Sequence, residues 1–172
     1  MNRLIQNGIR MCLVWSCALV LSGCHHYQLG MPSELPFKTV YVAPVENSSF
    51  APQAQAVLAQ QVIDALMREG VKVTDAHRAD ATLSIELVDY TRTVSATQPE
   101  DTLLAQSFAA EIKATAALVD NRSGLVYFSD RLHASSQQVF VDEGFQSSEY
   151  QAMPAVLRQL AANIVSTVVS TW

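Results

Sequence analysis

Cysteine is scarce in this chain of 172 residues, and its three cysteines all lie near the N-terminus, at Cys12, Cys17 and Cys24. From residue 25 onward the sequence holds no thiol, so this part can form neither an internal disulfide nor a thiolate metal site. The four histidines also lack the spacing of metal ligands. They are His25, His26, His77 and His133. We therefore expect no metal and no cofactor.

Basic residues are few and are not clustered. Arg3 and Arg10 precede the first acidic residue, Glu34, and beyond these two arginines nine Lys and Arg stand against 16 Asp and Glu, a net charge of −7. This balance argues against a nucleic-acid partner and against capture of the whole surface by anionic lipid headgroups. A Gly-rich phosphate loop and a Gly-x-Ser-x-Gly nucleophile elbow are also missing. We expect no enzymatic activity.

The most apolar run near the N-terminus, Met11–Leu21, is shorter than the roughly 20 residues that a membrane-spanning helix needs. After a basic start without acidic residues, it fits the apolar region of a secretory signal. Small residues then lead to a cysteine in Leu21-Ser22-Gly23-Cys24, which resembles the lipobox of bacterial lipoproteins. The resemblance implies that residues 1–23 are removed and that Cys24 carries acyl chains. Three such chains anchor a protein stably.

Two other interpretations of this segment stay open, namely an ordinary signal peptide with an incidental cysteine and an uncleaved signal anchor. His25 follows the cysteine. In enterobacterial lipoproteins an Asp at that position favours retention in the inner membrane, so its absence favours the outer membrane. We expect a protein that is lipid-anchored on the periplasmic side of the outer membrane.

Residues 24–36, with Pro32 and Pro36, are expected to be the lipidated Cys24 and a tether, and residues 37–172 a single α/β domain. A first strand is predicted over about Thr39–Val45, followed by a turn at Glu46–Ser49. Pro52 suits the first turn of a helix, and apolar residues at helical spacing follow it. They are Ala54, Leu58, Val62, Ala65 and Leu66, and Gly70 stands where the C-terminal cap belongs.

Three long strands are predicted next. Alternation of apolar and polar residues marks one from Ala81 to about Val94 and another around Ile112–Leu118. The turn Asp120–Gly124 leads into a return strand from Leu125 to near Gln138. A second amphipathic helix then carries Met153, Leu157, Leu160, Ala161, Ile164 and Val168.

Each predicted helix has one apolar stripe, so both helices should cover the same face of the sheet. The expected fold class is α+β: a two-layer sandwich of a mostly antiparallel four-stranded sheet with two helices packed on one face. The other sheet face should be polar, and such a face is usually only solvated. It carries Thr82, Ser84, Glu86, Lys113 and Thr115. A partner that is itself polar would also fit it.

Several short motifs resemble the LptE family of lipopolysaccharide-assembly lipoproteins. They are Cys24-His25-His26-Tyr27-Gln28-Leu29-Gly30, Leu35-Pro36, the strand and turn from Val40 to Pro52, Ala79-Asp80-Ala81-Thr82-Leu83 and Asp89-Tyr90-Thr91-Arg92. The resemblance implies a plug for the LptD β-barrel of the outer membrane, which assists barrel assembly and lipopolysaccharide transport to the surface. A plug needs a polar exterior, because barrel lumens are polar and wet.

The resemblance also implies contact with lipopolysaccharide phosphates through basic residues. The candidates are Arg92, Lys113, Arg122 and Arg131. For each of them, a surface cation on an acidic domain is the simpler interpretation. Another kind of periplasmic lipoprotein also stays open, either a regulator of peptidoglycan synthases or a subunit of a secretion pore.

Overall fold

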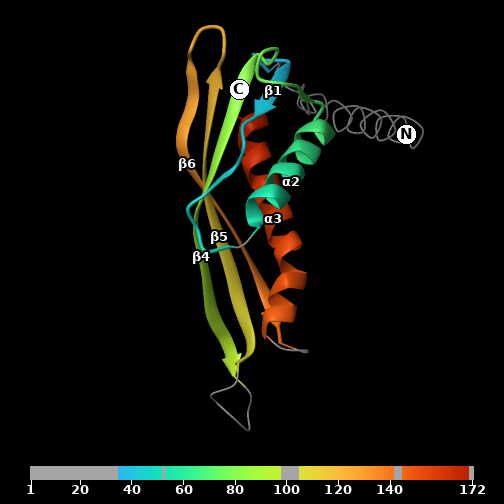
Figure 1. The fold of residues 1–172 in the computed structure, drawn as a ribbon, viewed down its shortest axis with the longest axis vertical. Coiled ribbons are helices and arrows are strands. Elements are labelled where there is room, and N and C mark those ends of the chain that lie inside the picture. The colour runs from blue at the N-terminus through green and yellow to red at the C-terminus, as the bar shows by residue number, and fades with distance from the viewer. Residues whose placement is uncertain (1–34, 52, 98–104, 142–144, 171–172) are drawn as a thin grey trace, which may run out of the picture. The chain divides into compact units, whose positions relative to one another are not determined.

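A mixed β-sheet covered on one face by two helices makes up the described part of the protein (Figure 1). The computed structural model describes residues 35–51, 53–97, 105–141 and 145–170, which belong to one unit, Leu35–Trp172. The expected signal peptide, Cys24 and the tether as far as residue 34 lie outside the described residues.

The six strands are arranged in the order β3-β1-β4-β5-β6, with β2 also paired to β4. The long strands form an antiparallel meander of β4 (Ala81–Thr97), β5 (Ala105–Asp120) and β6 (Val126–Phe140). The short strands make parallel pairs and are β1 (Thr39–Val42), β2 (Glu46–Asn47) and β3 (Lys72–Val73). The expected α+β class is confirmed, but the sheet is mixed and six-stranded rather than mostly antiparallel and four-stranded.

The parallel pairing follows from the connection between β1 and β4. Helix α2 (Ala54–Arg68) lies between these strands in the sequence, and a strand that returns after a crossover helix runs parallel to the first. β1 ends before Pro44, which has no N–H to donate to the ladder. Two residues of the turn predicted at Glu46–Ser49 form β2 instead, where Asn47 lies opposite Leu87.

Helix α2 buries the five residues of its predicted apolar stripe, Ala54, Leu58, Val62, Ala65 and Leu66. Gly70 follows the helix with φ +80°, and its N–H donates to the carbonyl of Met67 at 3.1 Å. Only glycine adopts this left-handed conformation without strain, so the predicted cap is confirmed. Pro52 lies outside the described residues.

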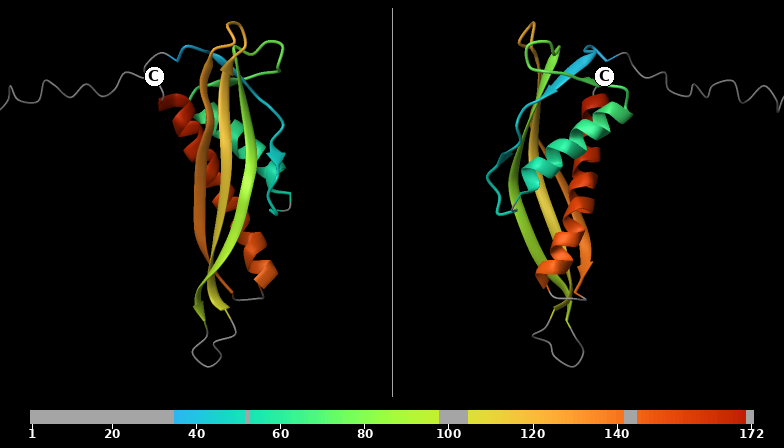
Figure 2. Two further views of the ribbon diagram at one scale, coloured as in Figure 1. Left: turned by 90° about the vertical axis from the view of Figure 1, so that its left-hand side faces the viewer. Right: turned by 45° about the vertical axis from the view of Figure 1, so that its right-hand side comes forward.

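Helix α3 (Phe145–Ser170) packs along the same face of the sheet as α2 (Figure 2). Its buried residues are Val156, Leu157, Leu160, Ala161, Ile164, Val165 and Val168. They join the α2 stripe and the helix-facing residues of β4 and β5, such as Leu87 and Ile112, in one hydrophobic cluster. By length and composition Ser148–Ser170 could cross a membrane, but this buried stripe makes α3 a core helix.

Two bulges change which residues face the helices. In β4, Leu87 pairs with Ala114 and Asp89 with Lys113, so Val88 is an extra residue. Beyond this bulge, Tyr90, Arg92 and Val94 pair with the residues of β5 that face the helices. These three side chains therefore lie on the helix side of the sheet. In β6 the register shifts around Asp130, which has φ +50°. A bulge of one residue reverses the alternation of the strand that follows.

Candidate functional site

The sheet face turned away from the helices carries mostly polar side chains along the three long strands, together with the exposed apolar side chains of Leu132 and Phe140, and we call it the polar face. In the left view of Figure 2 these strands lie in front of α3, and no described helix covers them. Its polar side chains are half-buried or exposed. They are Thr82, Ser84, Glu86, Asp89, Thr91 and Thr93 of β4, Glu111, Lys113 and Thr115 of β5, and Ser136 and Gln138 of β6. The predicted polar face is therefore present.

Lys113 is a cation on the polar face that two carboxylates balance. Its ammonium group lies 3.2 Å from the carboxylate of Asp89 on β4 and 3.9 Å from that of Glu111 on its own strand. The Lys113 side chain keeps 33% of its surface exposed, so water weakens these attractions. An anionic ligand at Lys113 would have to compete with two acidic neighbours.

Arg92 lies on the opposite side of the sheet, near the N-terminal part of α3. Its guanidinium group pairs with Glu149 at 3.0 Å, and the hydroxyl of Tyr90 donates to the other oxygen of the same carboxylate. Burial raises the pKa of Tyr90, and the hydrogen bond to Glu149 raises that pKa further. Together these contacts fix α3 to β4.

Arg122 lies in the turn between β5 and β6, where it pairs with Asp80 at 2.5 Å. Asp80 also accepts hydrogen bonds from the hydroxyl of Thr39 at 2.9 Å and from the backbone N–H groups of Lys38 and Thr39 at 3.1 and 3.0 Å. The bond from the Thr39 hydroxyl is the main reason why the pKa of Asp80 is lowered. Arg122 is thus part of a cluster that holds the start of β1.

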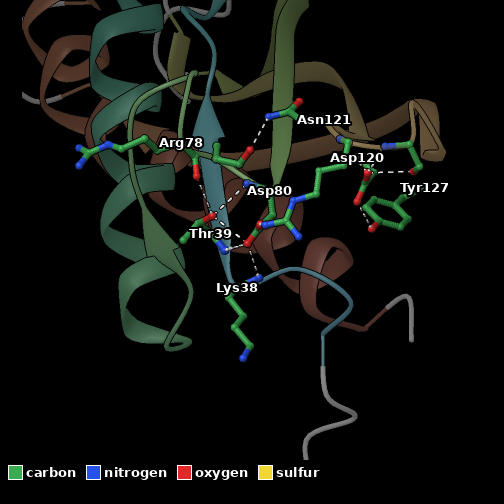
Figure 3. A network of polar contacts seen from close by, with 10 residues as sticks. Lys38, Thr39, Arg78, Asp80, Asp120, Asn121 and Tyr127 are labelled. Atoms are coloured by element: carbon green, nitrogen blue, oxygen red, sulfur yellow. Dashed lines mark hydrogen bonds and ion pairs between the residues drawn. The ribbon is translucent and has the colours of Figure 1, made fainter.

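The turn itself is held by Asp120 and Asn121 (Figure 3). Asp120 accepts from the backbone N–H of Ser123 at 2.7 Å, from its hydroxyl at 2.8 Å and from the Tyr127 hydroxyl at 3.0 Å. These bonds, led by that from the Ser123 N–H, lower the pKa of Asp120 to about 2. Asn121 donates to the carbonyl of Ala79 at 2.9 Å, which ties the turn to the start of β4.

Arg131 also lies on the helix-facing side, opposite Ala116, because of the bulge at Asp130. Its guanidinium carbon is 5.8 Å from the centre of the Phe128 ring, within the range of a cation–π contact. The structure therefore divides the four predicted cations among the polar face, the helix side and the β5–β6 turn. It does not gather them into one site.

Two features of the structure had no signal in the sequence. One is a groove of about 880 Å³ beside β4, lined by Phe50, Val57, Tyr90, Tyr150 and Met153 among others. Tyr90 and Tyr150 are far apart in the sequence, so nothing in it predicted that they would meet. The other is a pair of buried polar groups on β6, the Nε2 of His133 and the hydroxyl of Ser135, which have no hydrogen-bond partner among the described residues.

Solved structures from several bacteria share this fold. A minor lipoprotein from Acinetobacter baumannii is 14% identical with a TM-score of 0.53, over 77% of this chain and 93% of that one. A protein from Xanthomonas campestris is 17% identical with a TM-score of 0.55, over 81% and 89%. Lipoprotein B from Nitrosomonas europaea is 14% identical with a TM-score of 0.52, over 81% and 84%. At such identities the likeness establishes the fold alone.

No curated protein sequence matches the chain at a significant level. The family model of LptE, described as lipopolysaccharide-assembly, matches residues 37–168. These residues are more than half of the chain and include every strand and nearly all of both helices described above. The protein therefore belongs to the LptE family, with a role in lipopolysaccharide assembly.

Proposed function

We propose that this protein occupies the lumen of an LptD-type β-barrel in the outer membrane, assists barrel assembly and takes part in lipopolysaccharide transport to the cell surface. In this role it is a binding and assembly factor without catalytic activity. The observation that carries the proposal is the polar face, which no described helix covers although the opposite face holds the whole apolar core.

The chemistry of the polar face suits a barrel lumen. Lumens are lined by polar side chains and water, so a plug gains by presenting hydroxyl, amide and balanced charged groups to the wall. On the polar face most of the hydrogen-bonding groups are Thr, Ser and Gln side chains, and Lys113 is balanced by Asp89 and Glu111. Glu86, Asp89 and Glu111 outnumber Lys113, so this surface keeps a small excess of negative charge, which a wet wall can solvate.

The size of the sheet also supports a plug. β4 has 17 residues, and at about 3.3 Å per residue it is roughly 55 Å long. A bilayer with its headgroup regions is about 40–45 Å thick. One end of the meander can therefore stand at the periplasmic mouth of a barrel while the other reaches well into the lumen.

Acylation of Cys24 would keep the domain beside the membrane. Lys38, where the hydrogen bonds to Asp80 begin, is 14 positions along the chain from Cys24. Fully extended, this stretch spans at most about 50 Å. We therefore propose that the anchor lies in the periplasmic leaflet of the outer membrane and that the domain stays near the barrel mouth.

Contact with lipopolysaccharide is the finer part of the proposal. We propose Lys113 on the polar face and Arg122 in the turn as the cations that contact phosphates, since both are accessible and the Arg122 side chain keeps 81% of its surface exposed. Both cations already pair with carboxylates. Phosphate must therefore displace or share these partners, which favours a doubly charged group over a single one.

Copurification from outer membranes in mild detergent tests the barrel complex. The unaltered chain should bring down a large β-barrel. Ser136→Arg, which adds a long cation to the polar face, should release the barrel, whereas Ala56→Arg on the exposed side of α2 should retain it. Recovery of the unaltered chain alone would contradict the proposal. Recovery with a penicillin-binding protein, with normal surface lipopolysaccharide after depletion, would identify a regulator of peptidoglycan synthases instead.

A further inference from the structure

β4 has an open edge that runs over about half of its length. On one side β4 pairs with β5 from Ala81 to Thr97, but on the other side its last partner is Asn47 of β2, opposite Leu87. From Asp89 to Thr97 no described strand pairs with this side of β4. In the left view of Figure 2 this part of β4 forms the lateral margin of the sheet below β2.

The backbone groups at this open edge follow from the register. The carbonyls of Leu83 and Leu87 accept hydrogen bonds at 2.9 Å from Ala43 and Ser48, so the helix-facing residues of β4 turn their backbone groups away from β5. After the bulge, Tyr90 and Val94 are the helix-facing residues of β4. They pair with Ile112 and Phe108 of β5, a strand whose side chains alternate between the two faces without a bulge in this stretch. Their N–H and C=O groups therefore point toward the open edge.

The groove of about 880 Å³ runs beside this edge. Two aromatic side chains on its walls are strongly exposed, Phe50 at 94% and Tyr150 at 79%, and Val57 is exposed as well. Large aromatic side chains in such positions are typical of surfaces that bind another protein. Open backbone and exposed aromatic groups thus lie on the same side of the molecule.

The groove carries little net charge. Glu149 and Arg92 both line it, but they pair with each other at 3.0 Å, and the Glu149 carboxylate also accepts a hydrogen bond from Tyr90. A charged group placed here would lose water and would have to compete with this ion pair for a counter-ion. The side chains of an occupant that enter the groove must therefore be apolar.

We propose that an extended segment of another polypeptide adds as a strand to the open edge of β4, Asp89–Thr97, in line with β2. The apolar side chains of this segment enter the groove between Phe50 and Tyr150. Its polar side chains, which alternate with them, lie on the polar face beside Thr91 and Thr93. This is recognition by strand addition, in which the backbone supplies affinity and alternate side chains supply specificity. An acyl chain could fill the groove but could not satisfy the backbone of Tyr90 and Val94.

A labelled peptide of alternating valine and threonine, bracketed by lysines, is the probe. The full chain extracted in mild detergent should bind it saturably in fluorescence anisotropy, and the peptide should slow hydrogen exchange at the amides of Tyr90 and Val94. Val94→Pro removes an edge donor but no bond to β5, so it should weaken binding at least about tenfold. Val94→Thr, which keeps the donor, should bind within about twofold of the original chain.

Two further arms separate the alternatives. Two peptides are N-methylated at alternate residues, one at the odd positions and one at the even positions. Only one of these sets of N–H groups points toward β4, so one of the two peptides should fail to bind. Tyr150→Ser and Phe50→Ser alter exposed groove walls without touching the sheet and should weaken binding even if Val94→Pro folds poorly. Absence of peptide binding, equal binding by both methylated peptides as for simple apolar capture, or a dimer that Val94→Pro dissociates would each overturn the proposal.

Discussion

The hydroxyl of Tyr90 in β4 donates a hydrogen bond to the carboxylate of Glu149 in α3, 59 residues further along the chain. The same carboxylate pairs with Arg92 at 3.0 Å. Tyr90 reaches this position only because the bulge at Val88 turns it toward the helices. This contact joins the N-terminal part of α3 to the long meander.

Removing the Tyr90 hydroxyl should lower stability measurably. Tyr90→Phe leaves the largely buried carboxylate of Glu149 with one partner fewer, so we expect the free energy of unfolding to fall by about 1–2 kcal/mol. Tyr41→Phe is the matched control, since the Tyr41 hydroxyl has no hydrogen bond among the described residues, and it should change stability by less than about 0.5 kcal/mol. In urea denaturation, Tyr90→Phe combined with Glu149→Gln should cost less than the sum of the two single changes.

Asp120 should make the protein sensitive to acid. Its pKa in the folded state is about 2, below the ordinary value of 3.8 for an aspartate, because the folded turn donates hydrogen bonds to the ionised form. A lowered acid pKa adds stability that is complete above the unfolded pKa and is lost as the pH falls through the folded one. The stability advantage over Asp120→Asn should therefore be constant above about pH 5 and shrink toward pH 2. An advantage that does not change with pH would contradict this assignment.

His133 should give a second, milder pH dependence. Burial lowers the pKa of its imidazole below 6.5, and the nearby charge of Arg131 adds to the shift. Because the folded state favours the neutral ring, this contribution is complete above pH 6.5 and is lost as the pH falls through the lowered pKa. His133→Leu should remove this dependence in denaturation at pH 5–7. It should not destabilise the protein at pH 7, since the lost Nε2 atom has no partner among the described residues.

Gly70 should tolerate asparagine better than alanine. Its φ of +80° is unfavourable for a residue with a Cβ, while no atom lies within 4 Å of where that Cβ would be. The cost is therefore one of backbone conformation alone, about 1 kcal/mol for Gly70→Ala. Gly70→Asn should cost less, because asparagine enters the left-handed region more readily. Equal thermal midpoints for the two variants would indicate that the turn rearranges.

Lys113 should matter for ligand binding more than for folding. Lys113→Ala removes a partly exposed ion pair, so we expect a loss of stability below about 1 kcal/mol. If the polar face meets lipopolysaccharide phosphates, the same change should lower retention on immobilised lipopolysaccharide several-fold. Lys72→Ala, which removes an exposed lysine from β3, should leave retention unchanged. Equal loss by both variants would mean a general effect of charge.

The sequence predicted the elements of this fold well where burial repeats regularly. Helical spacing identified the stripe of α2 from Ala54 to Leu66, and strict alternation identified the buried face of β4 as far as Leu87. It could not identify the parallel partners of β4, because alternation is the same in parallel and antiparallel strands. β2 was too short, at two residues, to leave any pattern.

The candidate site was harder to predict for a related reason. Lys113 was correctly assigned to the polar side, since no irregularity separates it from the alternating residues of β5. Arg92 and Arg131 lie beyond bulges, and one extra residue reverses the side to which every later side chain points. Neither Val88 nor Asp130 was recognised in the sequence as the site of a bulge. The structure was therefore needed to show on which face of the sheet Arg92 and Arg131 lie.

The Asp80 cluster has a mechanical consequence. Phe37 is buried at 2% exposure, and the next two residues, Lys38 and Thr39, both donate backbone hydrogen bonds to the carboxylate of Asp80. A force applied to the chain from its N-terminal side is therefore transmitted to the sheet first through the buried Phe37 ring and the Asp80 carboxylate. Because Asp80 is also joined to the β5–β6 turn through Arg122, the load spreads into the long strands instead of peeling away the four residues of β1.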